Sequence, residues 1–255
     1  MAMVAGLLAL SLLAAGPGGP DGAPQRFKIE VKQAQTVDLT ALGQGPQENN
    51  VDAIGFVSIT MSDTAGGKIA HVVLDSMTLN ATGAAAGALP PFLADSAKGA
   101  IWHLYIVNGK IEGTPKPSKE SQAVAIIQQG IGSLFNPIKG AKVGDTWTDT
   151  TNINNTNEQG SQTGTTITTW TVDGLAGGVF TLTAKAEGTL SGEQQGGQML
   201  MSGTTTSTAK VVSAAIGPAS SIGIESAQTM SITVPMADAP IPITGKTTVT
   251  VTPLP

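Results

Sequence analysis

The segment 118–136, SKESQAVAIIQQGIGSLFN, has apolar residues that recur every three or four positions. Such spacing places the apolar side chains along one face of an α-helix. Ser118 can cap the first turn, Glu120 lies where the helix dipole favours a negative charge, and Pro137 ends the segment. The two glycines within it each cost a helix about 1 kcal/mol relative to alanine. We therefore predict one amphipathic helix over residues 118–136, with a stability that depends on packing.

Most of the remaining sequence alternates apolar and polar residues with a period of two. In Arg26–Lys32 the odd positions are apolar and the even positions are charged, which is typical of a strand with one buried face. The parity of the apolar residues changes after Phe56 and again between Leu74 and Met77, which predicts a bulged residue in each of two paired strands. The dipeptide Asn108-Gly109 is typical of a tight hairpin turn. Further strands are expected over 101–107, 145–153, 163–172, 179–190, 198–212, 222–234 and 244–252, and a loop over 81–91.

These strands follow one another with short turns and without alternating helices, which favours an antiparallel sheet. We expect an all-β, mainly antiparallel fold in which about ten to twelve strands form a strongly curved sheet or half-barrel that wraps the helix. The prolines at positions 235, 240 and 242 predict that the last strand lies at a sheet edge. Residues 26–255 are long enough to form a single β-rich domain with its own core.

The composition excludes several classes of protein. Charged residues make up 12% of the 255 residues, the net charge is −5, and there is no cysteine. Disulfide scaffolds and cysteine-based metal or redox sites are therefore excluded. A nucleic-acid partner is not expected, because the pI is about 4.9 and no run of basic residues occurs.

The amino terminus resembles an export signal. Residues 1–16 are apolar throughout and too short for a transmembrane helix, which needs about 20 residues. Small residues at Ala14, Ala15 and Gly16 suit signal cleavage, although no basic residue precedes the apolar run. We predict a signal peptide over 1–15, a flexible spacer over 16–25, and a periplasmic, cell-envelope or extracellular protein; a buried amino-terminal helix is the alternative. For an outer-membrane barrel, nine aromatic residues are few to form two girdles.

The sequence presents no convincing catalytic, metal-binding or cofactor-binding group. His71 and His103 lie in the middle of expected strands, away from acidic residues at metal-site spacing. No Gly-x-Ser-x-Gly elbow occurs, and Asp145 with Asp149 fits solvated strand positions better than a glycosidase pair. A Ser-His-Asp arrangement remains open, because its members need not be neighbours in the sequence. We expect a protein that is not an enzyme.

Four aromatic residues flank the helix region: Trp102, Tyr105, Phe135 and Trp147. They can line an apolar cleft between helix and sheet, or form ordinary core. Two hypotheses follow. The first is a non-enzymatic exported protein that binds an apolar or amphipathic ligand, such as a lipid, in the concave face. The alternative is a structural or adhesive surface module without a small-molecule ligand.

The stretch that follows the helix contains Lys142-Val143-Gly144-Asp145-Thr146-Trp147, preceded by Pro137-Ile138. This motif resembles a family of uncharacterised bacterial secreted proteins and lipoproteins. That family is similar in plan to the lipoprotein-carrier half-barrel, so the resemblance implies a curved antiparallel sheet around a helix. It implies no activity. This chain lacks the lipidated cysteine of the lipoprotein members. The motif also has a structural interpretation, in which Gly144-Asp145 forms a tight turn and Trp147 points into the core.

Overall fold

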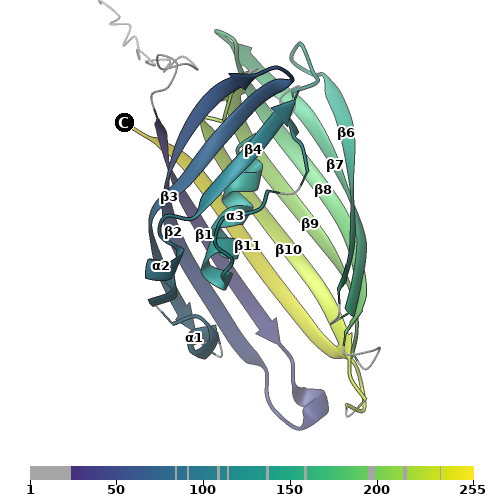
Figure 1. Ribbon diagram of the computed structural model, residues 1–255. Helices are drawn as coiled ribbons and strands as arrows, with labels where there is room; N and C mark the ends of the chain where they lie inside the picture. Colours follow the sequence, from purple (N-terminus) through teal and green to yellow (C-terminus); the bar gives the residue numbers. More distant parts are fainter. Residues whose placement is uncertain are drawn as a thin grey trace, which may run out of the picture.

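The computed structural model describes residues 24–83, 85–90, 92–107, 110–113, 115–135, 138–157, 160–194, 199–214, 217–235 and 237–255. Eleven strands form one open, curved antiparallel sheet in the order β5-β4-β3-β2-β1-β11-β10-β9-β8-β7-β6 (Figure 1). The all-β half-barrel expected from the sequence is confirmed. The strands are β1 (Gln25–Val37), β2 (Gln47–Thr64), β3 (Gly67–Thr82), β4 (Ile101–Val107), β5 (Lys110–Ile111), β6 (Thr146–Asn157), β7 (Gly160–Ala176), β8 (Val179–Gln194), β9 (Met199–Ala214), β10 (Ser221–Thr233) and β11 (Ile241–Leu254).

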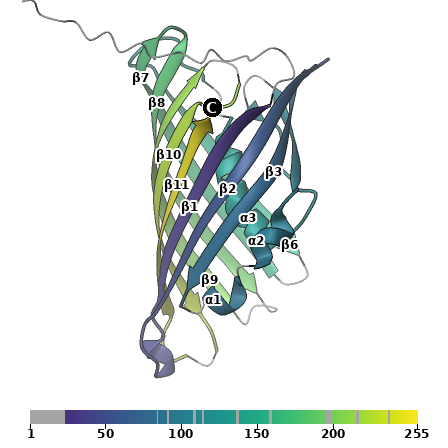
Figure 2. The same cartoon turned by 90° about the vertical axis from the view of Figure 1, so that its left-hand side faces the viewer.

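The sheet consists of two meanders that meet in its centre. The chain runs from β1 outward to β5, crosses the open side through helix α3 (Gln122–Ser133), and returns from β6 to β11 beside β1. Figure 2 shows β1 and β11 side by side. The last strand is therefore central, and its predicted place at an edge is wrong. The prolines are compatible with this position because Pro235 and Pro240 lie outside the strands and Pro242 lies at the start of β11.

One of the two predicted bulges is confirmed and the other is wrong. In β3, Asp75 is the extra residue, because Ser76 pairs with Phe56 and Leu74 pairs with the next residue of β2. Its carboxylate accepts a hydrogen bond from the Ser58 hydroxyl at 2.6 Å. Strand β2 itself keeps one parity, since Val51, Ala53, Val57 and Ile59 are all buried on one face. Its apolar residues at positions 54 and 56 lie on the other face and are half-buried, so the change of parity in the sequence does not mark a bulge in β2.

Helix α3 lies inside the curved sheet, as predicted, but is shorter than the expected 118–136. Its cap is Ser121, whose hydroxyl accepts a hydrogen bond from the Val124 amide at 3.2 Å. The expected cap, Ser118, instead accepts a hydrogen bond from the Ile101 amide of β4 at 3.0 Å. Residues before Ser121 are therefore used to hold the sheet edge rather than to extend the helix.

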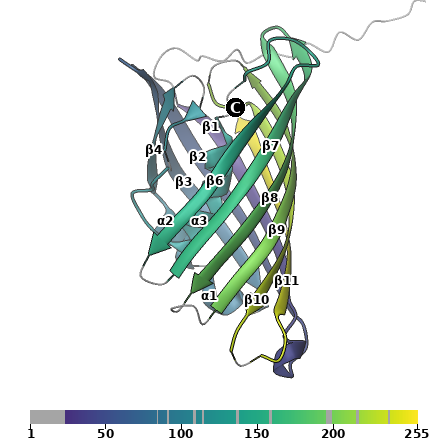
Figure 3. The same ribbon diagram turned by 90° about the vertical axis from the view of Figure 1, so that its right-hand side faces the viewer.

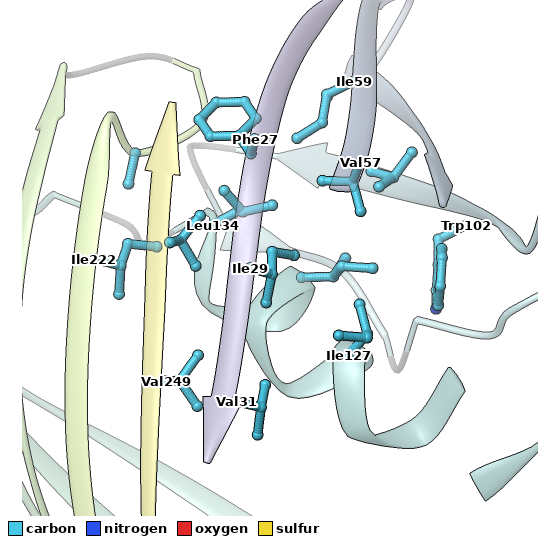
Figure 4. Packing of buried hydrophobic residues seen from close by; sticks show 14 of the residues in the cluster. Phe27, Ile29, Val31, Val57, Ile59, Trp102, Ile127, Leu134, Ile222 and Val249 are labelled. Carbon is cyan, nitrogen blue, oxygen red and sulfur yellow. The ribbon is translucent and has the colours of Figure 1, made fainter. Parts of the chain in front are cut away.

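The core forms between α3 and the sheet (Figure 4). Ile127 and Leu134 point towards β1 and its neighbours, where Ile29 is fully buried. The approach is close: a Cβ added to Gly130 would lie 2.3 Å from Cγ2 of Ile29, and one added to Gly55 would lie 2.9 Å from Cδ1 of Ile127. Glycine at these two positions lets helix and sheet backbones approach each other.

Three short elements were not predicted: the 3₁₀ turn η1 (Thr40–Leu42) and the helices α1 (Ala85–Ala88) and α2 (Phe92–Ala97). Part of the loop expected over 81–91 thus forms α1, whose first amide donates to the Asn49 side chain at 3.1 Å. Among the described residues, none of the helices combines the length and apolar character that a membrane span requires. The predicted signal peptide 1–15, most of the spacer 16–25, and the Asn108-Gly109 turn lie outside the described residues, although Val107 and Lys110 pair across that turn.

Candidate functional site: the concave face of the sheet

The concave face can be assigned residue by residue from the strand register. Paired residues share a face, and successive residues of a strand alternate between faces. On β1 the buried residues Phe27, Ile29 and Val31 face α3, so the odd positions 33, 35 and 37 face the same way. The same counting applies to β8, β9, β10 and β11, which pair without a register shift among themselves.

Charged side chains of these strands avoid the concave face. On β1 and β8–β11 every charged residue occupies a convex position, namely Arg26, Lys28, Glu30, Lys32, Lys185, Glu187, Glu193, Lys210, Glu225 and Lys246. An unpaired charge in a partly enclosed space loses hydration that nothing replaces. The concave side of these five strands is therefore an uncharged surface.

The inward positions of the central strands form three bands along the strand direction. On β10 they are Ile222, Ile224, Ser226, Gln228, Met230 and Ile232, so the face changes from apolar to polar and back to apolar. Neighbouring strands repeat the order, with Phe27, Ile29, Val31, Gln33, Gln35 and Val37 on β1, and Val251, Val249, Thr247, Gly245, Ile243 and Ile241 on β11. The repetition in adjacent strands makes the bands continuous across β10, β11 and β1.

The first band is filled. Helix α3 covers it, and its side chains are buried in the main core together with Ile127, Ile131 and Leu134 of the helix. Figure 4 shows this packing around Ile29, Val249 and Ile222. This part of the concavity is a packed interior.

The middle band is open. A cavity of about 540 Å³ lies between β1, β2, β10, β11, α1 and the exposed side of α3. Amides and hydroxyls supply most of its polar wall: Gln33, Gln35, Asn49, Gln129, Ser226, Gln228 and Thr247. Val51, Ala85 and Leu89 add apolar surface. Ala34 and Lys246 also border the cavity, but the strand register turns both side chains to the convex face, so the inward-facing polar side chains are amides and hydroxyls.

The third band, which we call the distal apolar band, consists of Val37, Leu190, Met199, Met201, Met230, Ile232, Ile241 and Ile243. It begins one inward position beyond the cavity wall, since Met230 follows Gln228 and Ile243 precedes Gly245. Ile241 and Ile243 are buried but lie outside the main core cluster. Met230 lies over Gly203, where an added Cβ would come within 2.7 Å of its side chain. Glycine here leaves room for a methionine, a flexible side chain that adapts to irregular apolar surfaces.

The four aromatic residues proposed from the sequence do not line one space. Trp102 is fully buried in the core (Figure 4). Tyr105 lies on the opposite, convex face of the same strand and is 57% exposed. Strand alternation separates the two because their positions differ by an odd number.

Phe135 lies in the core, and Trp147 packs against it. Phe135 is buried, and Trp147 is half-buried and stacks on Trp170 of β7 with ring centres 6.0 Å apart. The indole nitrogens of Trp102 and Trp147 are buried without a hydrogen-bond partner among the described residues. None of the four aromatic residues lines the open cavity, whose polar wall consists mainly of amides and hydroxyls.

The Gly-Asp-Thr-Trp motif forms a turn before β6. Gly144 has a positive φ of 91°, a conformation that glycine adopts without strain. The Asp145 carboxylate accepts hydrogen bonds from the amides of Ala141 at 2.8 Å and Lys142 at 3.0 Å. These bonds favour the charged form and hold the pKa of Asp145 below its ordinary value. The nearby Asp149 forms an ion pair with Lys139. Both carboxylates therefore have structural partners.

The described residues contain no group of three or more His, Cys, Asp or Glu side chains that could hold a metal ion. The residues of the middle and distal bands were not predicted from the sequence, where aromatic residues formed the expected lining. The signal was nevertheless present: taking every second residue of 222–232 or 27–37 gives the apolar–polar–apolar order directly. Recognising it required knowing which strands are neighbours.

Comparisons with known proteins bear on the fold. No family model matches the chain, and no curated protein matches it. Among solved structures, the chain is similar to lipovitellin, in a structure titled for lipid–protein interactions, with a TM-score of 0.52, 12% identity, and coverage of 92% of this chain and 25% of that one. It is also similar to the beta domain of the Bordetella autotransporter Brka, with a TM-score of 0.44, 8% identity, and coverage of 91% and 100%. The lipovitellin likeness shows the fold alone.

Proposed function

We propose that this chain is a non-enzymatic secreted or cell-envelope protein that binds an amphipathic ligand, such as a lipid, in the part of the concavity that α3 leaves open. The observation that carries the proposal is the continuity of an open polar cavity with the distal apolar band on one uncharged face. A polar head group fits the amides and hydroxyls of the middle band. A hydrocarbon chain fits the methionines, isoleucines and leucine beyond it.

The length of the middle and distal bands supports this arrangement. Inward positions on a strand are about 6.6–6.8 Å apart, so the two polar and two apolar inward positions of a strand together extend over about 20–27 Å along the concave face. Each methylene buried on the distal apolar band contributes about 0.8 kcal/mol. The lipovitellin likeness, in a protein whose structure concerns lipid–protein interactions, supports the proposal by analogy of fold only. The apolar segment at 1–15 supports export.

The lining also indicates the charge of the head group. A carboxylate or ammonium in the middle band would lose hydration without an opposite charge on the concave side of β1 and β8–β11. Neutral groups such as hydroxyls or esters exchange hydrogen bonds with Gln33, Gln35 and Gln228 instead. We therefore expect an uncharged amphiphile to be preferred.

Isothermal titration with monolauroylglycerol and laurate, which share one acyl chain, tests this function. We expect saturable binding of monolauroylglycerol and weaker binding of laurate. Met201→Gln should weaken binding by removing inward apolar surface, whereas Leu200→Gln should leave it unchanged, because Leu200 lies on the convex face and is 51% exposed. Equal binding by both variants, no binding of either probe, or native mass spectra without any co-purifying amphiphile would contradict the proposal.

A structural or adhesive module is the second candidate, and the open edge at β6 favours it. Among the described strands, β6 pairs only with β7, and it borders the sheet in Figure 3. Its sequence contains neither lysine nor proline, the residues that commonly protect an exposed edge. This candidate predicts concentration-dependent self-association by sedimentation velocity. A monomer at all concentrations would count against it, whatever the outcome of the lipid titrations.

A further inference from the structure

The two histidines of the chain lie against each other on the convex face of the sheet. His71 of β3 is directly opposite His103 of β4 in the antiparallel register. Their ring centres are 4.8 Å apart, and the ring planes are inclined by 73°. His103 is exposed and His71 is half-buried, so solvent reaches the pair. No other histidine occurs in the sequence.

This separation matches two imidazoles that share a metal ion. A metal–nitrogen distance of about 2.0–2.1 Å places the ion about 3.2 Å from each ring centre. Two such rings at about 90–110° around the ion then have centres about 4.5–5 Å apart. The observed 4.8 Å falls within that interval. Because the two histidines are paired across adjacent strands, both imidazoles can reach one ion.

The surroundings leave the remaining coordination positions to water. Thr60 of β2 is paired with His71, and Tyr105 is the next outward residue after His103. The described residues contain no third His, Cys, Asp or Glu that would complete a protein-only site. Imidazole suits Zn²⁺, Ni²⁺ and Cu²⁺, and affinity for such a site generally rises towards Cu²⁺.

We propose that His71 and His103 form a two-nitrogen site for a divalent transition-metal ion, with Cu²⁺ bound most tightly. The ion would join β3 to β4, the strand next to the two-residue edge strand β5. Because β3 and β4 share six paired positions, from Lys68 to Val73, a cross-strand metal link would reinforce a short pairing. The site lies on the convex face and is independent of the proposed ligand cavity.

Titration of the full chain with Cu²⁺ tests the proposal by calorimetry and electron paramagnetic resonance. We expect one tightly bound ion per chain and a spectrum with coupling to two equatorial imidazole nitrogens. His71→Gln and His103→Gln should each lose that two-nitrogen signal and bind Cu²⁺ more weakly than the native chain. Tyr105→Phe, on the same strand and face, should retain both.

A second measurement distinguishes the loss of metal binding from a structural effect of the substitutions. In the native chain, Cu²⁺ or Zn²⁺ should slow hydrogen exchange at the β3–β4 amides, and the double variant should show no metal-dependent slowing. Thermal unfolding without metal checks that the variants fold. A double variant that binds Cu²⁺ as tightly as the native chain, or a native spectrum without two coupled nitrogens, would overturn the assignment.

Discussion

At the scale of single residues, two glycines of α3 differ in the space around them. A Cβ at Gly130 would collide with Ile29, whereas a Cβ at Gly132 would have no neighbour within 4 Å. Helix propensity favours alanine over glycine by about 1 kcal/mol at both positions. Overpacking costs about 1–3 kcal/mol, and only Gly130 is subject to it.

We therefore expect Gly130→Ala to lower the free energy of unfolding by about 1 kcal/mol and Gly132→Ala to raise it by up to about 1 kcal/mol. Urea unfolding monitored by tryptophan fluorescence measures both. Two variants with shifts of the same sign would show that α3 is not seated on Ile29 as described.

Asp145 gives a prediction about pH. Hydrogen bonds from the Ala141 and Lys142 amides lower the pKa of its carboxyl in the folded chain. A lowered folded-state pKa adds stability above the unfolded-state pKa, and that stability is lost as the pH falls through the folded-state pKa. Asp145→Ala should therefore be less stable than the native chain near neutral pH, with a difference that shrinks in acid. Carbon-13 NMR titration of the carboxyl provides the direct check, and an ordinary pKa would contradict the described turn.

At the scale of elements, the sequence predicts whether a segment is a helix or a strand better than it predicts the residues at which the element begins and ends. The apolar spacing of 118–136 identified α3, and period-two alternation identified the strands, because both patterns follow from one buried face. The helix boundary was wrong by several residues because Ser118 and Ser121 are equally good caps in sequence, and only the sheet edge decides between them. Helices α1 and α2 are too short to have a period.

Experiment can distinguish the roles of Ser118 and Ser121. Ser121→Ala removes the cap of α3 and should cost about 1 kcal/mol, with faster hydrogen exchange in its first turn. Ser118→Ala removes the bond to the Ile101 amide and should instead loosen the start of β4. Hydrogen exchange read by mass spectrometry on peptides from each region distinguishes them. Loss of α3 protection in Ser118→Ala alone would restore the boundary expected from the sequence.

At the scale of the whole molecule, the sequence predicted the curved sheet around a helix but not the distribution of its lining. Two meanders that meet at β1 and β11 bring residues 27–37 and 222–251 together. Their inward positions form the bands only after this pairing, which alternation within one strand cannot specify. The four aromatic residues were expected to line a cleft because they flank the helix in sequence, yet Tyr105 lies on the convex face and Trp102 lies in the core. The candidate site therefore depends on topology more than on residue type.

Methyl NMR of the chain labelled at methionine tests the central claim, that an amphiphile binds on the distal apolar band. Met199, Met201 and Met230 lie in the band, while Met61 and Met77 lie on β2 and β3 and serve as internal controls. On titration with monolauroylglycerol, we predict saturable shifts of the three band methyls and little change in the two controls. Shifts confined to Met61 and Met77, or no saturable shift at any methionine, would contradict the account.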